Sequence, residues 1–378
     1  MTFKYWVTFL TMAIITGCQH PTGQTSTVSA AQTCQQDLKF LPDFLLTNDT
    51  GAPNHFAQKG HEHFDKALQH ALTQANTITQ LPQCQGIIAD YLRQWRPGHL
   101  GIVSLLPEDA NTTIPVSGNN QLIVSDAPQL TILSSQTLLL TLPSFAWEYQ
   151  APIEALLNDN RTTFDSHPYW ILDVRSNGGG SDSSYRQLLS RVLHNQSVSH
   201  GAEFLVTRAN IKAQTDICVA QADNLGCQQF IEPVVSAMNQ ASNGDYVLPI
   251  GRHALRYHLS QANNVAPQRV AVLIDRQCAS SCEEFLLDIR QGFNVKLVGR
   301  RSYGALDYSN MRPTILPSQA FELYYATSRS TRLPYLPVDV AGIPPDIYLP
   351  LASVQGFEQE VKATQHWLET GKFQPTDE

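Results

Sequence analysis

The sequence has no excess of positive charge and, after its first residues, no long apolar run. Its 378 residues include 25 Lys and Arg against 33 Asp and Glu, which gives a net charge of −8. Nucleic-acid-binding surfaces are basic, so this balance argues against nucleic acid as a partner. No apolar stretch after Gly17 reaches the roughly 20 residues that a membrane-spanning helix needs. The hydrophobic fraction of 42% is that of a globular protein with one large domain or two modest ones.

Motifs for cofactors and metals are missing as well. The glycines at 178–180 carry neither the Gly-Lys-Ser/Thr of a phosphate-binding loop nor a GxGxxG pattern, so nucleotide binding has no support. No Cys-x-x-Cys pair with partner histidines is present for zinc. His61, His63 and His70 do not have the i, i+4 spacing of a helical metal pair, and we interpret them as surface histidines. We therefore expect no cofactor and no metal.

The first residues resemble a bacterial lipoprotein signal. Lys4 gives a positive start, an apolar segment follows over residues 5–15, and Gly17 precedes Cys18. In such signals small residues admit the signal peptidase, and the cysteine thiol accepts the lipid. The resemblance implies that residues 1–17 are removed and that Cys18 anchors the chain to a membrane. Gln19, in place of the Asp typical of inner-membrane retention, implies the outer membrane of the cell envelope, facing the periplasm. The alternative is a plain signal peptide with a chance cysteine.

The cysteines after Cys18 are even in number, and an exported chain meets an oxidising compartment, so pairing is favoured. Proximity suggests a bridge between Cys218 and Cys227. The remaining distant pair, Cys34 with Cys84, is then a plausible second bridge. Two further cysteines flank a serine and are considered with it below.

Residues 35–97 are expected to form a small helical N-terminal domain. Apolar residues recur at helical spacing between residues 56 and 75, and a second helix runs from Ile88 to Trp95 before Pro97-Gly98 ends it. Residues 18–34, which precede this domain, are rich in Ser, Thr, Gln and Gly as far as Ala31 and are expected to be a flexible tether.

Beyond His99 the pattern changes to short strands, turns and helices. Near-continuous apolar runs at 169–174 and 269–274 are typical of strands buried on both faces. Each is followed by a turn and a helix-like stretch, which is the rhythm of βαβ units. Residues 98–378 are thus expected to form an α/β domain. The polar segment 209–265 is interpreted as an insertion between its core elements.

Ser280 lies between a buried strand and an expected helix. Such a turn exposes the hydroxyl, and the helix N-terminus favours negative charge nearby. By itself this position is more typical of a helix N-cap. The glycines at 178–180 leave backbone N–H groups unshielded, as an oxyanion hole requires. Cys278 and Cys282 stand two residues on either side of Ser280. A disulfide across the turn and two small buried thiols remain open alternatives.

These segments together resemble the carboxy-terminal-processing (tail-specific) serine protease family. The run Tyr-Trp-Ile-Leu-Asp-Val-Arg-Ser-Asn-Gly-Gly-Gly at 169–180 is similar to the family's strand-and-turn motif. Ala-Ser-Ser-Cys-Glu at 279–283 is similar to its nucleophile motif, in which the serine stands three residues before a glutamate; this register selects Ser280. Gly299 and Gly304 follow at the family spacing, and residues 340–346 are similar to its closing Gly-Val/Ile-x-Pro-Asp segment. The resemblance implies a ClpP/crotonase-like βαβ core and peptidase activity on protein or peptide substrates.

Two departures identify the branch of the family. Ala305 stands where the bacterial tail-specific branch has its catalytic lysine, and the chain has no room for a PDZ insert before Pro143. Both features resemble instead the core of tricorn protease, in which a histidine is the base. Trp-Arg-Pro-Gly-His-Leu-Gly-Ile at 95–102 is similar to the histidine turn of that branch, with Pro97 in place of Asp. His99 is therefore the expected general base for Ser280, since histidine has a suitable pKa.

The resemblance also implies how the rest of the site is built. Asp339 occupies the position of a glutamate that orients the histidine in the tricorn-like branch, although a solvated loop aspartate is an equal alternative. The oxyanion hole would use the N–H of Ser281 and one N–H from Gly178 or Gly179. Two other functions stay open: an inactive peptide-binding lipoprotein, and a crotonase-like acyl-transfer enzyme, for which no coenzyme A site is visible.

Overall fold

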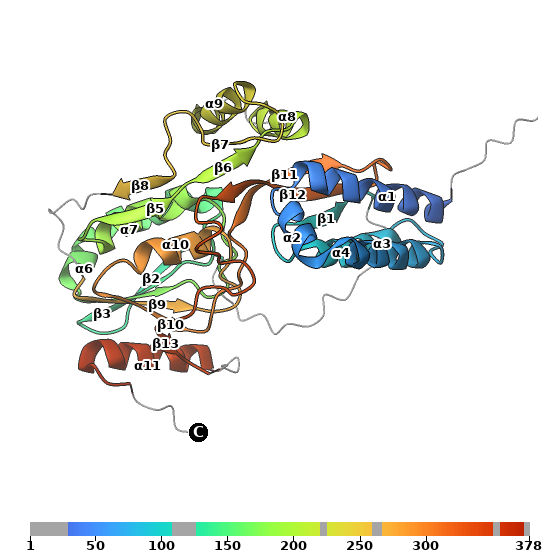
Figure 1. The fold of residues 1–378 in the computed structure, drawn as a ribbon. Helices are drawn as coiled ribbons and strands as arrows, with labels where there is room; N and C mark the ends of the chain where they lie inside the picture. The colour runs from blue at the N-terminus through green and yellow to red at the C-terminus, as the bar shows by residue number, and fades with distance from the viewer. Residues whose placement is uncertain (1–28, 108–125, 220–224, 259–266, 351–355, 374–378) are drawn as a thin grey trace, which may run out of the picture.

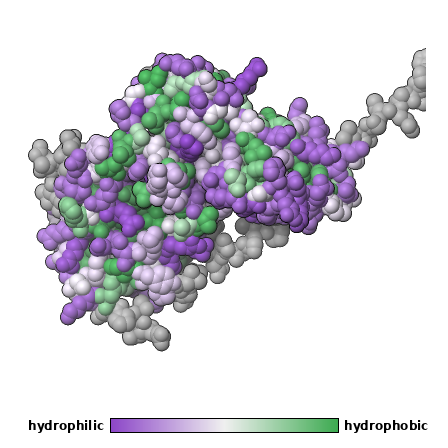
Figure 2. Space-filling model, viewed as in Figure 1, coloured by the Kyte–Doolittle hydropathy of each residue, from purple (hydrophilic) through white to green (hydrophobic). Residues whose placement is uncertain are grey.

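The computed structural model describes residues 29–107, 126–219, 225–258, 267–350 and 356–373. The expected signal peptide and its lipid-accepting Cys18 lie outside these ranges. Within them, no helix is both long and apolar enough to cross a membrane. Figure 1 shows a helical N-terminal region beside a larger α/β region. On the face seen in Figure 2, hydrophobic residues lie in scattered patches between hydrophilic ones.

The N-terminal region consists of four helices: α1 (Ala30–Asn48), α2 (Ala52–Lys59), α3 (His61–Ala75) and α4 (Gln83–Trp95). Their buried apolar side chains share one core with Phe321 and Leu323 of strand β12 (Phe321–Ser330) and with Leu316, which follows strand β11 (Tyr308–Ile315). The predicted disulfide between Cys34 and Cys84 is confirmed and joins α1 to α4. The helices therefore cover one face of the sheet that contains these strands and do not stand apart from the catalytic region.

Two details of this region differ from the sequence-based expectation. The tether expected over 18–34 already turns into helix at Ala30, because Ser29 Oγ accepts from Gln32 N at 3.2 Å while Ser29 N donates to Gln32 Oε1 at 3.0 Å. The stretch 56–75 is interrupted at Gly60, whose φ of 80° no helix tolerates. The chain there forms α2 and α3 in succession.

A six-stranded sheet lies at the centre of the α/β region, in the order β13-β10-β9-β4-β3-β2. The strands are β2 (Gln129–Ile132), β3 (Thr137–Thr141), β4 (Tyr169–Asp173), β9 (Arg269–Ile274), β10 (Val295–Gly299) and β13 (Ile347–Tyr348). All neighbours are parallel except β2, which runs antiparallel to β3. The expected βαβ core with a small helical N-terminal part is thereby confirmed.

Both faces of this sheet are covered. Alternate residues of β9 point to opposite sides, Val270 and Val272 into one apolar cluster and Ala271 and Leu273 into another. The first cluster is completed by α5 (Gln150–Asp159), α6 (Arg161–Ser166), α7 (Arg186–Val192) and α10 (Ser281–Ile289). The second is closed by α11 (Gly356–Thr370), which lies beneath the sheet in Figure 1. Burial on both faces explains why β4 and β9 are apolar throughout.

A second sheet connects this core to the N-terminal helices. Its long strand β12 (Phe321–Ser330) pairs with β1 (Gly101–Ser104), β6 (Ala202–Leu205) and β11 (Tyr308–Ile315), and β6 pairs with β7 (Tyr246–Val247). A small ribbon joins β5 (Ser197–His200) to β8 (Leu255–His258).

The segment expected as a polar insertion at 209–265 holds much of α8 (Arg208–Asp216), together with α9 (Leu225–Asn239), β7 and β8. The predicted disulfide between Cys218 and Cys227 is confirmed. Short 3-10 turns at η1 (Trp147–Tyr149) and η2 (Asp182–Tyr185) complete the described elements.

Candidate active site

The site forms where β4 and β9 end. These strands are parallel neighbours, so the turns that follow their carboxyl ends emerge side by side at one edge of the sheet. The turn after β4 carries the glycines at 178–180, and the turn after β9 carries Ser280. The two motifs, about a hundred residues apart in the sequence, are thus brought into contact by strand pairing.

Ser280 is the residue at which the turn becomes α10. Its φ of 58° is rare for a residue with a side chain, and it is half-buried, so the hydroxyl stands at a sharp, partly accessible corner. Its backbone N–H donates to Ala305 O at 3.0 Å and faces Glu283 Oε2 at 3.3 Å. This strained backbone is held in place from outside the turn.

Glu283 supplies much of that support. The carboxylate is fully buried and accepts from Ser302 Oγ at 2.5 Å, Gly304 N at 2.7 Å and Ala305 N at 2.8 Å. Burial raises the pKa of Glu283, while these donors act in the opposite direction. From the sequence, Glu283 served only to identify Ser280, and not Ser281, as the expected nucleophile. The structure adds a function: Glu283 joins the nucleophile turn to the loop at 302–305.

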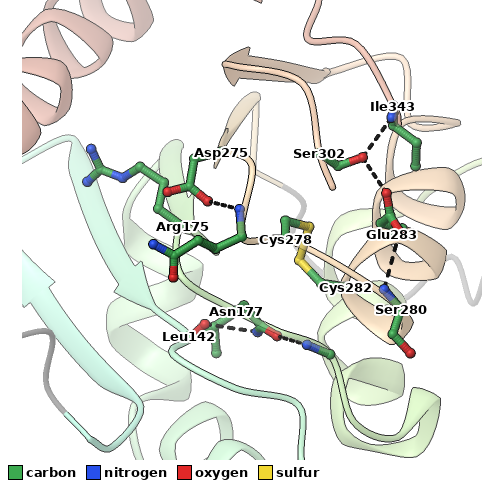
Figure 3. The surroundings of a disulfide bond; sticks show 12 residues. Leu142, Arg175, Asn177, Asp275, Cys278, Ser280, Cys282, Glu283, Ser302 and Ile343 are labelled. Carbon is green, nitrogen blue, oxygen red and sulfur yellow. Dashed lines mark hydrogen bonds between the residues drawn. A yellow bond between two sulfur atoms is a disulfide. The ribbon is translucent and has the colours of Figure 1, made fainter. Parts of the chain in front are cut away.

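A disulfide between Cys278 and Cys282 closes the same turn, and both cysteines are buried (Figure 3). Of the two alternatives left open by the sequence, the structure has the disulfide. The bridge lies between Asn177 on one side and Glu283 on the other, as the labelled side chains in Figure 3 show. The serine turn is therefore anchored covalently as well as by hydrogen bonds.

Asn177 fixes the glycine turn against the serine turn. Its side chain donates from Nδ2 to Leu142 O at 3.0 Å and accepts from Gly179 N at 2.9 Å, while its carbonyl accepts from Ala279 N at 3.3 Å. Gly179 lies so close that a Cβ there would be 2.7 Å from Ser280 Cβ. Only glycine fits this approach.

The predicted oxyanion-hole residues line this junction. The N–H of Gly179 is engaged by Asn177 Oδ1. Among the described residues, the N–H groups of Gly178 and Ser281 have no acceptor, whereas Ser281 Oγ donates to Gly180 O at 3.0 Å. Gly178 and Ser281 are thus the members of the predicted set with N–H groups left for a ligand.

His99 is brought to the site by the turn that follows α4. Its φ is 47°, and its ring Nδ1 lies 2.5 Å from the carbonyl oxygen of Tyr308. A carbonyl only accepts, so Nδ1 carries the proton and Nε2 keeps the lone pair. Burial, with the Arg96 guanidinium next in effect, lowers the pKa of His99 to about 4, so the ring is neutral at pH 7.

Arg96 stabilises this turn by hydrogen bonds to its backbone. Its side chain is buried, donates to His99 O at 2.8 Å and to Gly98 O, and pairs with Asp49 at 2.6 Å. Asp49 in turn accepts from Ala52 N at 2.8 Å, so the turn is tied to the start of α2. Arg96 and Asp49 could not be identified from the sequence, since a buried ion pair between residues so far apart has no local pattern.

Ala305 joins the histidine turn to the serine turn. Its carbonyl accepts from Ser280 N, and its Cβ lies against Gly98, where an added Cβ would come within 2.5 Å. The ring of Tyr303 lies on the same side of Gly98. Ala305, which stands at the position of the lysine of the other branch, thus contacts both the turn that carries His99 and the turn that carries Ser280.

Asp339 lies in the loop that packs against residues 302–307. Its Oδ1 accepts from Leu306 N at 2.6 Å and from Asp307 N at 2.7 Å. Burial raises the pKa of Asp339 to about 6. The Nδ1 position of His99, where an orienting carboxylate was expected, is taken by Tyr308 O. A direct role of Asp339 at His99 stays a prediction. In the described ranges no group of three His, Cys, Asp or Glu side chains is placed to hold a metal ion.

Solved structures share this fold over nearly the whole chain. Mature CPAF superposes with a TM-score of 0.62 at 13% identity, covering 91% of this chain and 99% of CPAF. A candidate peptidase from Parabacteroides merdae superposes with a TM-score of 0.54 at 16% identity, covering 92% and 98%. At these identities the likeness is one of fold.

No curated protein sequence matches the chain. The sequence pattern of "Peptidase family S41" does match, over residues 136–349. That range includes β4, β9, Ser280 and Asp339, while His99 lies before it. The resemblance to carboxy-terminal-processing serine peptidases is therefore confirmed: the chain belongs to peptidase family S41 and is a serine peptidase.

Proposed function

We propose that the protein is an endopeptidase that cleaves extended or unfolded protein segments, with Ser280 as nucleophile and His99 as general base. The observation that carries this proposal is the approach of two strained turns through Ala305, one bearing a half-buried serine and the other a neutral histidine. The lone pair on His99 Nε2 supports the assignment of the base, since a serine hydroxyl needs one.

In the proposed reaction His99 Nε2 takes the proton of Ser280 Oγ while Oγ attacks the peptide carbonyl. The negative charge that develops on the carbonyl oxygen would be met by the N–H groups of Ser281 and Gly178. The tetrahedral intermediate collapses with loss of the amine, which receives the proton from His99. Water, deprotonated by the same nitrogen, then releases the acyl group from Ser280.

The test is labelling with a fluorophosphonate probe alongside hydrolysis of an unfolded protein. The wild type should be labelled on Ser280, and Ser280→Ala should lose labelling and hydrolysis while it still folds. His99→Ala should lose hydrolysis by about a thousandfold or more. Ser281→Ala is the matched control and should keep most activity, because the proposal uses only its backbone N–H.

Two results would contradict the proposal. An adduct on Ser281 would shift the register of the mechanism by one residue. A folded wild type with neither labelling nor hydrolysis, but with affinity for unfolded chains, would favour the inactive peptide-binding lipoprotein.

We further propose that Cys18 carries lipid and holds the protein on the outer membrane, facing the periplasm. The support is the sequence before Cys18 together with Gln19 after it. Cell fractionation of a Cys18→Ser variant tests this proposal. The variant should leave the membrane fraction, and complete retention there would overturn the anchor.

A further inference from the structure

We infer that the backbone carbonyl of Tyr308 orients His99, and that Asp339 is a positioning residue that holds this carbonyl in place without needing its own negative charge. The inference rests on the proposed role of His99 as base. In this arrangement a backbone carbonyl, and not a carboxylate, accepts from His99. The carboxylates bind the backbone next to that carbonyl.

The first observation is the contact itself. His99 Nδ1 and Tyr308 O are 2.5 Å apart. An orienting group must accept from Nδ1 so that Nε2 faces the serine, and a backbone carbonyl fulfils that requirement as well as a carboxylate does. What the carbonyl lacks is a full negative charge to stabilise the imidazolium that forms during the reaction.

The second observation is that Tyr308 is fixed from both ends. It is the first residue of β11 and stands opposite Arg329 of β12. Its hydroxyl accepts from Asn54 Nδ2 at 3.2 Å, and its ring lies 5.6 Å from the Arg96 guanidinium. The side chain is thereby anchored to the helical region while the carbonyl is aimed at His99.

The third observation is a reciprocal pair of carboxylates, Asp307 directly before Tyr308 and Asp339 in the neighbouring segment. Asp339 Oδ1 accepts from the backbone N–H groups of Leu306 and Asp307. Asp307 Oδ2 accepts from Val338 N at 2.7 Å and Asp339 N at 2.8 Å. Each aspartate thus binds the backbone of the other's segment. The chain that enters Tyr308 is held on both sides, which is how Asp339 can act on His99 without contacting it.

The two possible roles of Asp339 predict different behaviour of one substitution. Asparagine keeps an oxygen that accepts two N–H donors, but it has no charge. Where a carboxylate contacts the histidine directly, the change to asparagine lowers kcat about 10⁴-fold. If Asp339 only holds the loop, Asp339→Asn keeps that function, and Asp339→Ala loses it.

The experiment compares Asp339→Asn and Asp339→Ala in the full chain, by kcat and KM on a peptide substrate. We expect kcat/KM of Asp339→Asn to stay within about threefold of the wild type. For Asp339→Ala, we expect kcat to fall by about 10 to 100-fold, with KM little changed, because the base is displaced. Asp346→Asn is the matched control. Its carboxylate also holds a backbone N–H, that of Leu297 at 2.8 Å, but on the central sheet.

Two readouts separate positioning from mere stability. Ring ¹⁵N shifts, assigned by difference from His99→Gln, should show a protonated Nδ1 and a free Nε2 in both wild type and Asp339→Asn. Burial raises the pKa of Asp339 to about 6, with Asp307 and Arg96 as the neighbouring charges. If the charge is not needed, the pH profile of kcat/KM shows no step there.

A fall of about a thousandfold or more in Asp339→Asn would overturn the inference in favour of a direct carboxylate. Full activity of Asp339→Ala would also overturn the inference, because it would show that Asp339 has no positioning role. If Asp339→Ala does not fold, the asparagine variant and its spectra still decide. Loss of probe labelling on Ser280 in the wild type would instead mark failure of the proposed function.

Discussion

At the scale of single residues, the protonation state of His99, the proposed base, depends strongly on its surroundings. His99 is half-buried, its Nδ1 donates to Tyr308 O, and the Arg96 guanidinium lies behind it. Burial and that positive charge both disfavour the protonated ring. In the free enzyme, His99 therefore stays neutral, and can accept a proton, at pH values well below the usual pKa of histidine.

This predicts an unusual pH dependence. With the pKa of His99 lowered to about 4, kcat/KM should be level from about pH 5 to pH 8 and fall about tenfold per unit below about pH 4. The sign follows because protonated His99 cannot accept the proton of Ser280. Initial rates on a substrate without titrating groups measure the profile, with circular dichroism at each pH as the control for folding. An acidic limb at pH 6.5 or above would contradict the assigned environment.

The same shift contributes to stability. A histidine whose pKa is lowered in the folded state favours folding fully above its unfolded pKa of about 6.5. That contribution is lost as the pH falls from there through about 4. Loss of activity and loss of folding must therefore be measured separately in acid.

At the scale of elements, the loop at 302–307 is the connection on which the site depends. Its backbone N–H groups donate to Glu283, next to the serine turn, and to Asp339. Ala305 of the loop also contacts Gly98 of the histidine turn. Ala305 stands at the centre of the loop with its side chain buried. Its small side chain allows the histidine turn to lie close to this loop.

A lysine at this position should therefore damage the site. Ala305→Lys must displace Gly98 or the loop, because the Cβ of Ala305 already lies against the Gly98 backbone. A displacement of about 1 Å in the base can lower kcat about a hundredfold, and we expect a fall of at least that size. Ala305→Gly is the matched control and should stay within about tenfold of the wild type. Peptide hydrolysis measures both.

The same substitution also tests the branch assignment. Ala305→Lys should fail to restore activity to His99→Ala. Activity regained in that double variant would show that a lysine can act from this position and that the histidine turn leaves room for it.

At the scale of the whole molecule, the helical region supports the turn that carries His99, the proposed base. The buried pair of Asp49 and Arg96 joins the start of α2 to the histidine turn, and Asp49 also accepts from Ala326 N of β12 at 3.0 Å. This one ion pair thus connects the helices, the second sheet and the turn that carries His99. Its value depends on both partners remaining, since a lone buried charge is costly.

Arg96→Met should therefore lower both stability and activity. Leaving Asp49 without its cation is expected to cost about 3–5 kcal/mol in the free energy of unfolding. Urea unfolding measures that cost. Arg96→Lys is the matched control, which keeps the charge but loses the planar fork, and it should fall between wild type and Arg96→Met. In any folded Arg96→Met protein, the acidic limb of kcat/KM should move upward, because the cation that helps lower the pKa of His99 is gone. An unchanged limb would show that Arg96 does not act on His99.

Much of the architecture could be predicted from the sequence alone. The apolar runs at 169–174 and 269–274 became β4 and β9, and the glutamate at 283 placed Ser280 at the first corner of α10. Cys218 and Cys227 were paired correctly by proximity. Such features are local: periodicity, apolar content and motif spacing belong to short stretches of chain.

Tertiary structure alone decided which group His99 contacts. No residue pattern indicates that Tyr308 O meets His99, because every residue carries a carbonyl and only the fold chooses which one is presented. The ion pair of Asp49 and Arg96 likewise joins segments far apart in the chain. So do the hydrogen bonds that Asp339 accepts from Leu306 N and Asp307 N. The sequence by itself indicated which side chains are candidates for the reaction, and long-range packing determined which backbone groups they contact.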